Sequence, residues 1–198
     1  DSSHAPLTPA DEVELLDHLQ SGGKLFLTGQ DIAEYYAGTA LLDSLGVGFV
    51  QNTSTTIVRG VTGNLISGGL ILIISSSGGA NNQTSSDVIQ VTNSSVSLPI
   101  FYYGSGTTYP AGIANFNPTS LAKAVFLGYG YEAINDAAKR SQLLSRILDY
   151  LNEPVTSLTT RQLSGLIPEQ FELSQNYPNP FNPETRIRFA VPFDSEVK

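Results

Sequence analysis

Two short apolar runs, KLFLT at 24–28 and AVFL at 124–127, constrain the fold of this chain most strongly. Each run is followed by a glycine-containing turn and then by a helix pattern. Continuous apolar runs of this length, bounded by turn residues, are typical of strands that are buried on both faces. Strands that alternate with helices predict an α/β fold whose core strands are parallel.

Helix signals surround both runs. A first helix is predicted to begin after Thr8, a good N-cap residue, and to end at Gly22. A second helical piece is predicted over 31–46, and a last helix is predicted to begin near Asn135 or Asp136. The apolar stripe predicted for this last helix consists of Leu144, Ile147, Leu148 and Leu151.

The middle of the chain, residues 52–120, has short β-branched runs between clusters of Gly, Ser and Asn, which predicts an irregular β insert. The chain opens with a helix, whereas a doubly wound α/β domain usually opens with a strand, so a first strand is expected to be missing. The predicted organisation is an α/β domain over 1–153, a linker over 154–170 and a separate C-terminal segment over 171–198.

Composition excludes several classes of function. The formal net charge is −8, with only ten Lys and Arg residues, which argues against a nucleic-acid surface and against a polybasic membrane contact. The absence of Cys excludes thiolate catalysis, Cys-ligated metals and disulfides. The longest apolar run, 68–75, is too short to span a bilayer. No phosphate-binding loop pattern is present, and no cofactor is expected.

The C-terminal stretch FELSQNYPNPFNPETRIRF, residues 171–189, places three prolines between two strand patterns. It resembles the opening of the type A C-terminal sorting domain, which marks cargo of the type IX secretion system in Bacteroidetes and related phyla. The resemblance covers 171–198 and implies the start of a small β-sandwich and recognition by the secretion machinery. The residues by themselves also fit an ordinary Pro-rich linker. The matching residues are Leu173, Asn176, Tyr177, Pro178, Asn179, Pro180, Phe181, Asn182, Pro183, Thr185, Ile187 and Phe189.

A second resemblance covers residues 7–152 and rests on LTPADEVELLDHLQSGGKLFLTGQDIAEYY and AVFLGYGYEAINDAAKRSQLLSRILDYL. Both stretches are similar to the glutamine-amidotransferase-like Rossmannoid domains of secreted, multidomain bacterial proteins. This resemblance implies a flavodoxin/amidotransferase-like sheet with parallel core strands, preceded by one further strand. Active amidotransferases use a Cys, a His and often a Glu. This chain has no Cys, and Tyr131 and Glu132 stand where the His and Glu are expected, so amidotransferase chemistry is not expected.

Acidic side chains follow both apolar runs: Asp31 and Glu34 after the first, Glu132 and Asp136 after the second. Open α/β sheets bind ligands at the carboxyl ends of their strands. Asp31 and Glu132 are therefore the candidate acid–base pair. The candidate oxygen ligands of a metal are Asp31, Glu34 and Asp136. The favoured alternative is structural, because Asp31 and Asp136 stand at predicted helix starts, where acids cap free N–H groups.

These observations favour a non-catalytic accessory or scaffold module of a secreted or cell-surface bacterial protein that is exported through a type IX-type system. One alternative is an extracellular filament subunit that assembles by exchanging the strand of its C-terminal arm between copies of itself. Another is an extracellular hydrolase that uses Asp31 and Glu132. The predicted partners are the secretion machinery, other domains of a parent protein, or further copies of this chain.

Overall fold

The computed structural model describes residues 6–153 and the two short strands Glu172–Leu173 and Phe189–Ala190. The chain divides into two compact units, Asp1–Leu163 and Ser164–Lys198. The predicted linker 154–170 lies outside the described residues.

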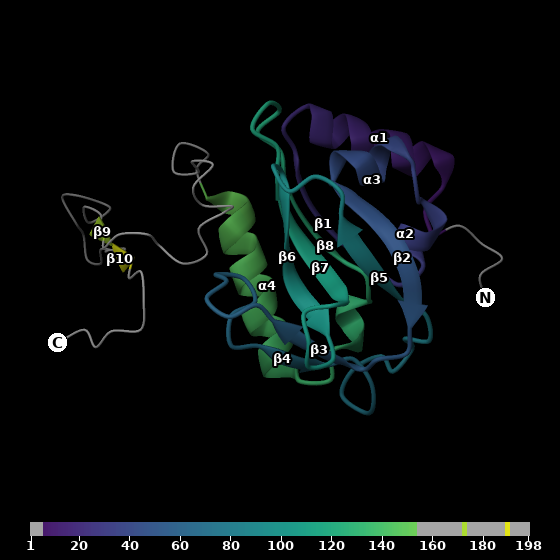
Figure 1. Ribbon diagram of the computed structural model, residues 1–198, viewed down its shortest axis with the longest axis vertical. Helices are drawn as coiled ribbons and strands as arrows, with labels where there is room; N and C mark the ends of the chain where they lie inside the picture. The colour runs from purple at the N-terminus through teal and green to yellow at the C-terminus, as the bar shows by residue number, and fades with distance from the viewer. Residues whose placement is uncertain (1–5, 154–171, 174–188, 191–198) are drawn as a thin grey trace. The chain divides into compact units, whose positions relative to one another are not determined.

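The first unit is built on a six-stranded sheet with the strand order β1-β8-β7-β6-β3-β4 (Figure 1). Only β1 and β8 pair in parallel, and the other neighbouring strands of this sheet pair antiparallel. A second, two-stranded antiparallel sheet pairs β2 (Val47–Thr53) with β5 (Ser86–Val91). The strands of the large sheet are β1 (Lys24–Thr28), β3 (Ile57–Gly60), β4 (Ile71–Ile73), β6 (Ser97–Tyr103), β7 (Pro110–Phe116) and β8 (Lys123–Leu127).

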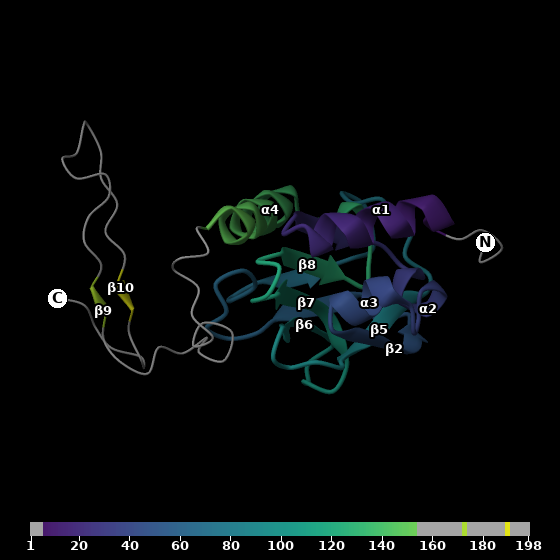
Figure 2. The same cartoon turned by 90° about the horizontal axis from the view of Figure 1, so that it is seen from above.

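Helices cover both faces of the large sheet. They are α1 (Pro9–Gln20), α2 (Ile32–Tyr35), α3 (Ala40–Ser44), the 3₁₀ turn η1 (Tyr131–Ala133) and α4 (Ala137–Asn152). Figures 1 and 2 show α4 on one side of the sheet and the pair α2–α3 on the other. Alternate residues of β8 join the two cores: Val125 packs in the cluster that contains α4, and Phe126 packs in the cluster that contains α3. This alternation explains why the run 124–127 is apolar throughout.

The predicted flavodoxin/amidotransferase-like sheet with parallel core strands is wrong. The run 124–127 is buried on both faces, as expected, but its second neighbour is the antiparallel strand β7. Residues 52–120 do not form an insert, because β3, β6 and β7 come from this segment and complete the sheet. An apolar run reports that a strand is covered on both faces, and it does not report the direction of the neighbouring strands.

The local helix signals are confirmed at both ends of the domain. Thr8 caps α1, since its hydroxyl accepts the N–H of Asp11 at 3.2 Å and the Asp11 carboxylate accepts the N–H of Thr8 at 2.8 Å. The second helical piece is two short helices, α2 and α3, with Gly38 between them at φ 76°. A left-handed residue of this kind ends a helix rather than continuing it.

The last helix buries two of the four residues of the predicted stripe, Ile147 and Leu151, but its buried face is rotated from the one predicted. Its buried residues are Leu143, Ile147 and Leu151, spaced four residues apart. Leu148, which was assigned to the stripe, is 47% exposed. Because Leu143, Leu144, Ile147 and Leu148 are all apolar, the sequence allows two overlapping stripes, and the packing against β8 selects one of them.

In the second unit, β9 (Glu172–Leu173) pairs antiparallel with β10 (Phe189–Ala190). Leu173 and Phe189, two residues of the predicted sorting segment, are directly opposite each other. Its proline-rich part, 176–183, lies outside the described residues. Among the helices of the described residues, none has the length and apolarity that crossing a membrane requires.

Candidate carboxylate site

The parallel pairing of β1 with β8 brings the segments after both strands to the same edge of the sheet. Gly29 donates its N–H to Leu127 O at 3.3 Å, and the Thr28 hydroxyl donates to Tyr129 O at 2.6 Å. The loop that leads into β5 is held at the same edge, because Gln30 Oε1 accepts the N–H of Thr84 at 2.8 Å. Two of the candidate acids that follow the two strands, Asp31 and Glu132, therefore both contact the loop 82–85.

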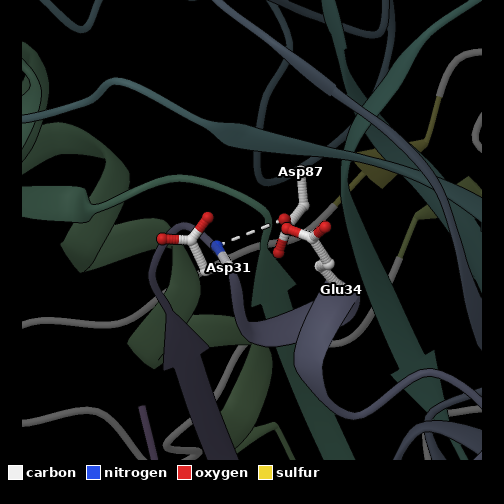
Figure 3. Close-up of side chains that lie close together, drawn as sticks. All are labelled: Asp31, Glu34 and Asp87. Atoms are coloured by element: carbon white, nitrogen blue, oxygen red, sulfur yellow. Dashed lines mark hydrogen bonds between the residues drawn. The ribbon is translucent and has the colours of Figure 1, made fainter. Parts of the chain in front are cut away.

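Asp87 on β5 is the buried centre of a carboxylate cluster with Asp31 and Glu34 (Figure 3). Asp87 has no exposed surface, and its two oxygens accept the N–H of Asp31 at 3.2 Å and the N–H of Ala33 at 2.7 Å. One ligand oxygen from each carboxylate lies within 4.8 Å of the others. Asp87 thus holds the start of α2 against β5.

Burial raises the pKa of Asp87 to about 7, and the nearby negative charges of Asp31 and Glu34 act in the same direction. The hydrogen bonds from Ala33 and Asp31 oppose this increase, because they stabilise the charged form. A buried carboxyl with this pKa changes its charge near neutral pH. Asp87 can therefore take up and release a proton under physiological conditions.

Asp31 does not cap α2 with its own side chain, so the capping interpretation of this residue is wrong. Its backbone is left-handed, with φ 65°, and its Oδ1 accepts a short hydrogen bond from the Ser85 hydroxyl. Asp is one of the few residues other than Gly that visit this backbone region readily. The conformation points the Asp31 carboxylate toward the loop before β5, while its N–H faces Asp87.

Glu34 and Glu132 are both exposed and each accepts a hydrogen bond from an Asn side chain. Asn52 Nδ2 donates to Glu34 Oε2 at 2.8 Å, and Asn82 Nδ2 donates to Glu132 Oε1 at 3.2 Å. Glu132 is not part of the cluster formed by Asp31, Glu34 and Asp87 among the described residues. The loop 82–85 contacts both members of the candidate acid–base pair.

Asp136 is the N-cap of α4, as the structural alternative predicted. Its Oδ1 accepts the N–H of Ala138 at 2.9 Å and the N–H of Lys139 at 3.1 Å. Within the described part of the chain, the group of acids that could share a hard cation consists of Asp31, Glu34 and Asp87, and does not include the predicted ligand Asp136.

Sequence reasoning missed Asp87. The sequence did contain a signal for this residue, because SDVIQV places an acid inside a strand rich in β-branched residues. A charged side chain in a buried strand needs a hydrogen-bonding partner. The partner itself could not be identified, since the N–H groups that bind Asp87 belong to residues 54 and 56 positions away in the chain.

No family model matches this chain, and no curated protein matches it. Among solved structures, the β-galactosidase from Rahnella sp. R3 is similar with a TM-score of 0.50 and 17% identity, over 85% of this chain and 24% of that chain. The β-galactosidase from Halorubrum lacusprofundi has a TM-score of 0.47 and 19% identity, over 75% of this chain and 21% of that chain. This chain thus spans less than a quarter of the length of either enzyme. The first likeness shows a fold shared with part of a β-galactosidase, in place of the expected flavodoxin-like fold.

Proposed function

We propose that this chain is a non-catalytic accessory module of an exported bacterial protein, and that residues 171–198 direct its export through a type IX-type system. The observation that carries the proposal is the match of LSQNYPNPFNPETRIRF, from Leu173 to Phe189, to the opening of the type A sorting domain. The division of the chain into two compact units supports it, because a sorting segment must be a separable part of its cargo.

The hydrogen bonds of the candidate acids support an accessory rather than a catalytic role. Asp136 caps a helix, Asp87 binds two backbone N–H groups, and Asp31 and Glu132 each accept from a neighbouring side chain. These contacts account for the acids by structure alone. The hydrolase alternative with Asp31 and Glu132 remains a prediction.

The likeness to part of a β-galactosidase is compatible with this proposal. The similar region makes up only 24% of the Rahnella enzyme, so a domain of this fold occurs there as one part of a larger chain. We infer that the domain over 1–153 likewise acts beside other domains of a parent protein at the cell surface. Its partners would then be those domains and, during export, the secretion machinery.

Export from a bacterium that has a type IX system tests the proposal. The full chain, a version ending at Glu153, and a version with Pro178, Pro180 and Pro183 changed to Ala would each be given a periplasmic leader. Only the unaltered chain is expected at the cell surface or in the medium, because the Pro-rich stretch carries the resemblance. Equal distribution of all three proteins between periplasm and medium would overturn the proposal.

A further inference from the structure

The large sheet ends at β1 on one side and at β4 on the other. Among the described strands, β1 pairs only with β8, so its backbone groups point alternately toward β8 and away from it. Gly23 O accepts an N–H of β8 at 3.2 Å, and Gly29 donates its N–H to the end of β8 at 3.3 Å. The alternate residues Lys24, Phe26 and Thr28 therefore point their backbone groups outward and form what we call the β1 edge.

Most of the β1 edge is open. Lys24 O accepts a hydrogen bond from His18 Nε2 of α1 at 3.1 Å. The backbone N–H and C=O groups of Phe26 and Thr28 have no hydrogen-bond partner within the described part of the chain. A row of unpaired donors and acceptors with the spacing of a strand is the template that a further strand recognises.

The opposite edge of the sheet is covered by the start of α4. The outward carbonyl groups of β4 belong to Ile71 and Ile73. Asn135 donates its N–H to Ile73 O at 2.9 Å, and Lys139 Nζ donates to Ile71 O at 2.9 Å. The fold thus protects one edge of the sheet from further pairing and leaves most of the β1 edge available.

The side chains of β1 are also less covered than those of its neighbour. β8, which has a strand on each side, is buried at all five positions, whereas only Leu27 is buried in β1. Leu25 is half-buried against the cluster that contains α1, and Phe26 is half-buried against the cluster that contains α4. A strand beside β1 would lie between the same two helices, so apolar side chains on both of its faces would be buried.

α4 presents apolar side chains toward this position. Arg146 Nη1 donates to Gly68 O at 2.9 Å and Lys139 Nζ donates to β4, so this side of α4 faces the β4 end of the sheet. Leu148 is about 200° around the helix from Arg146, and therefore faces the β1 end. Leu148 is 47% exposed, and Leu144 on the same side of α4 is half-buried.

Both α1 and α4 contact β1. In Figure 2 the two helices lie beyond β8, on the side away from β6 and β7, which is the side where β1 ends the sheet. Pairing with β1 of a second copy would place the α1 of that copy over a strand about 4.8 Å away. Packed helices are about 8–10 Å apart, so two α1 helices would collide. The β1 edge therefore fits a single strand better than a second copy of this domain.

We propose that the β1 edge binds one extended strand of a partner polypeptide, with apolar side chains on both faces of that strand. The backbone groups of Phe26 and Thr28 supply its hydrogen bonds. Leu25, Phe26 and Leu148 supply the apolar contacts. The site differs from the carboxylate cluster, and the proposal does not depend on residues 171–198 or on the route of export.

Amide hydrogen exchange of the ¹⁵N-labelled full chain, followed by NMR with a synthetic peptide, tests this inference. The probe is the acetylated and amidated hexapeptide KVVIVK with N-methyl groups along one edge, so that the other edge can pair but the peptides cannot stack. The N–H groups of Phe26 and Thr28 should exchange at least about tenfold more slowly when the probe is saturating. A control peptide with N-methyl groups along both edges should leave their exchange unchanged. Unchanged exchange with the probe, or equal slowing by both peptides, would overturn the proposal.

A matched pair of variants tests where the strand lies. Leu148→Gln changes an exposed side chain of α4, and Gln is a good helix former, so the fold should be retained. This variant should bind the probe about tenfold more weakly, because an apolar contact of the strand is lost. Leu65→Gln makes the same change at a position that is 78% exposed, between β3 and β4, and should bind normally. Equal affinity of both variants for the probe would contradict the proposed place of the strand.

Discussion

The charge of Asp87 links the stability of the domain to pH. The folded state holds a proton on this carboxyl up to about pH 7, whereas in the unfolded chain its pKa is the ordinary 3.8 of an Asp carboxyl. Between these values the folded state binds more protons, so the free energy of unfolding should fall as pH rises, by at most about 4 kcal/mol. Urea unfolding across this pH range measures the effect.

Asp87→Asn removes the titrating group and should flatten this part of the pH profile, although one of the two N–H groups loses its acceptor. Asp43→Asn changes an exposed acid that has no hydrogen bond to another described side chain, and serves as the control. The assignment to Asp87 would be refuted by a pH profile of Asp87→Asn that matches the profile of Asp43→Asn.

Residue roles were predictable where both partners lie within one turn of helix. Thr8 and Asp136 bind N–H groups two or three positions along the chain, so the pattern of a cap is visible in the sequence. Asp31 shows the opposite case: it occupies the N-cap position, but Asp87 from β5 supplies the acceptor. A local pattern identifies a helix start and cannot tell which carboxylate will bind there.

At the scale of elements, a residue of the sheet caps the C-terminal end of α4. Lys123 on β8 is fully buried, and its Nζ donates to Tyr150 O at 2.9 Å and to Glu153 O at 2.8 Å. Burial lowers the pKa of this ammonium group. The contact gives a donor to carbonyl groups at the end of the helix, which have no N–H group of a following turn to bond with.

Lys123→Met keeps the length of the side chain but removes the donor. The free energy of unfolding is expected to fall by about 1–3 kcal/mol, because two carbonyl groups lose their partner. Lys24→Met, at an exposed position of β1, should change stability by less than about 0.5 kcal/mol. Urea unfolding of both variants gives the comparison, and equal losses would argue against a closing role for Lys123.

The existence of most elements could be predicted, but their pairing could not. The strands at 24–28 and 124–127 and the two long helices were found because periodicity and caps are local properties. β7, which reads PAGIANF, was missed because Pro, Gly and Asn are poor strand formers, and its burial between β6 and β8 overrides that preference. Without β7, β8 lacked its antiparallel neighbour and the sheet was assigned the wrong strand directions.

At the scale of the whole molecule, the first unit should fold without the second. Among the described residues, both hydrophobic clusters consist of residues between Leu7 and Leu151. A chain ending at Glu153 should therefore unfold within about 0.5 kcal/mol of the full chain in urea. A larger loss of stability would show that the C-terminal unit contributes to the core of the first.

The same pair of chains tests the filament alternative. The proposed export role predicts that both chains sediment as monomers. Oligomers or fibres of the full chain alone, seen by sedimentation and electron microscopy, would favour strand exchange. The antiparallel pairing of β10 with β9 already gives the C-terminal strand a partner within its own unit. An exchanged strand would have to use the other edge of β10 or break this pair.

The parallel pair β1–β8 also determines when the domain can finish folding. The hydrogen bond from Thr28 to Tyr129 closes a separation of 101 residues, so β1 has no neighbour in the large sheet until almost the whole domain has been synthesised. The chain loses the conformational entropy of closing a loop of that length before the contact stabilises it, and this makes folding slow. A growing chain therefore cannot complete the large sheet until β8 emerges, although β3, β4, β6 and β7 can pair with one another before it.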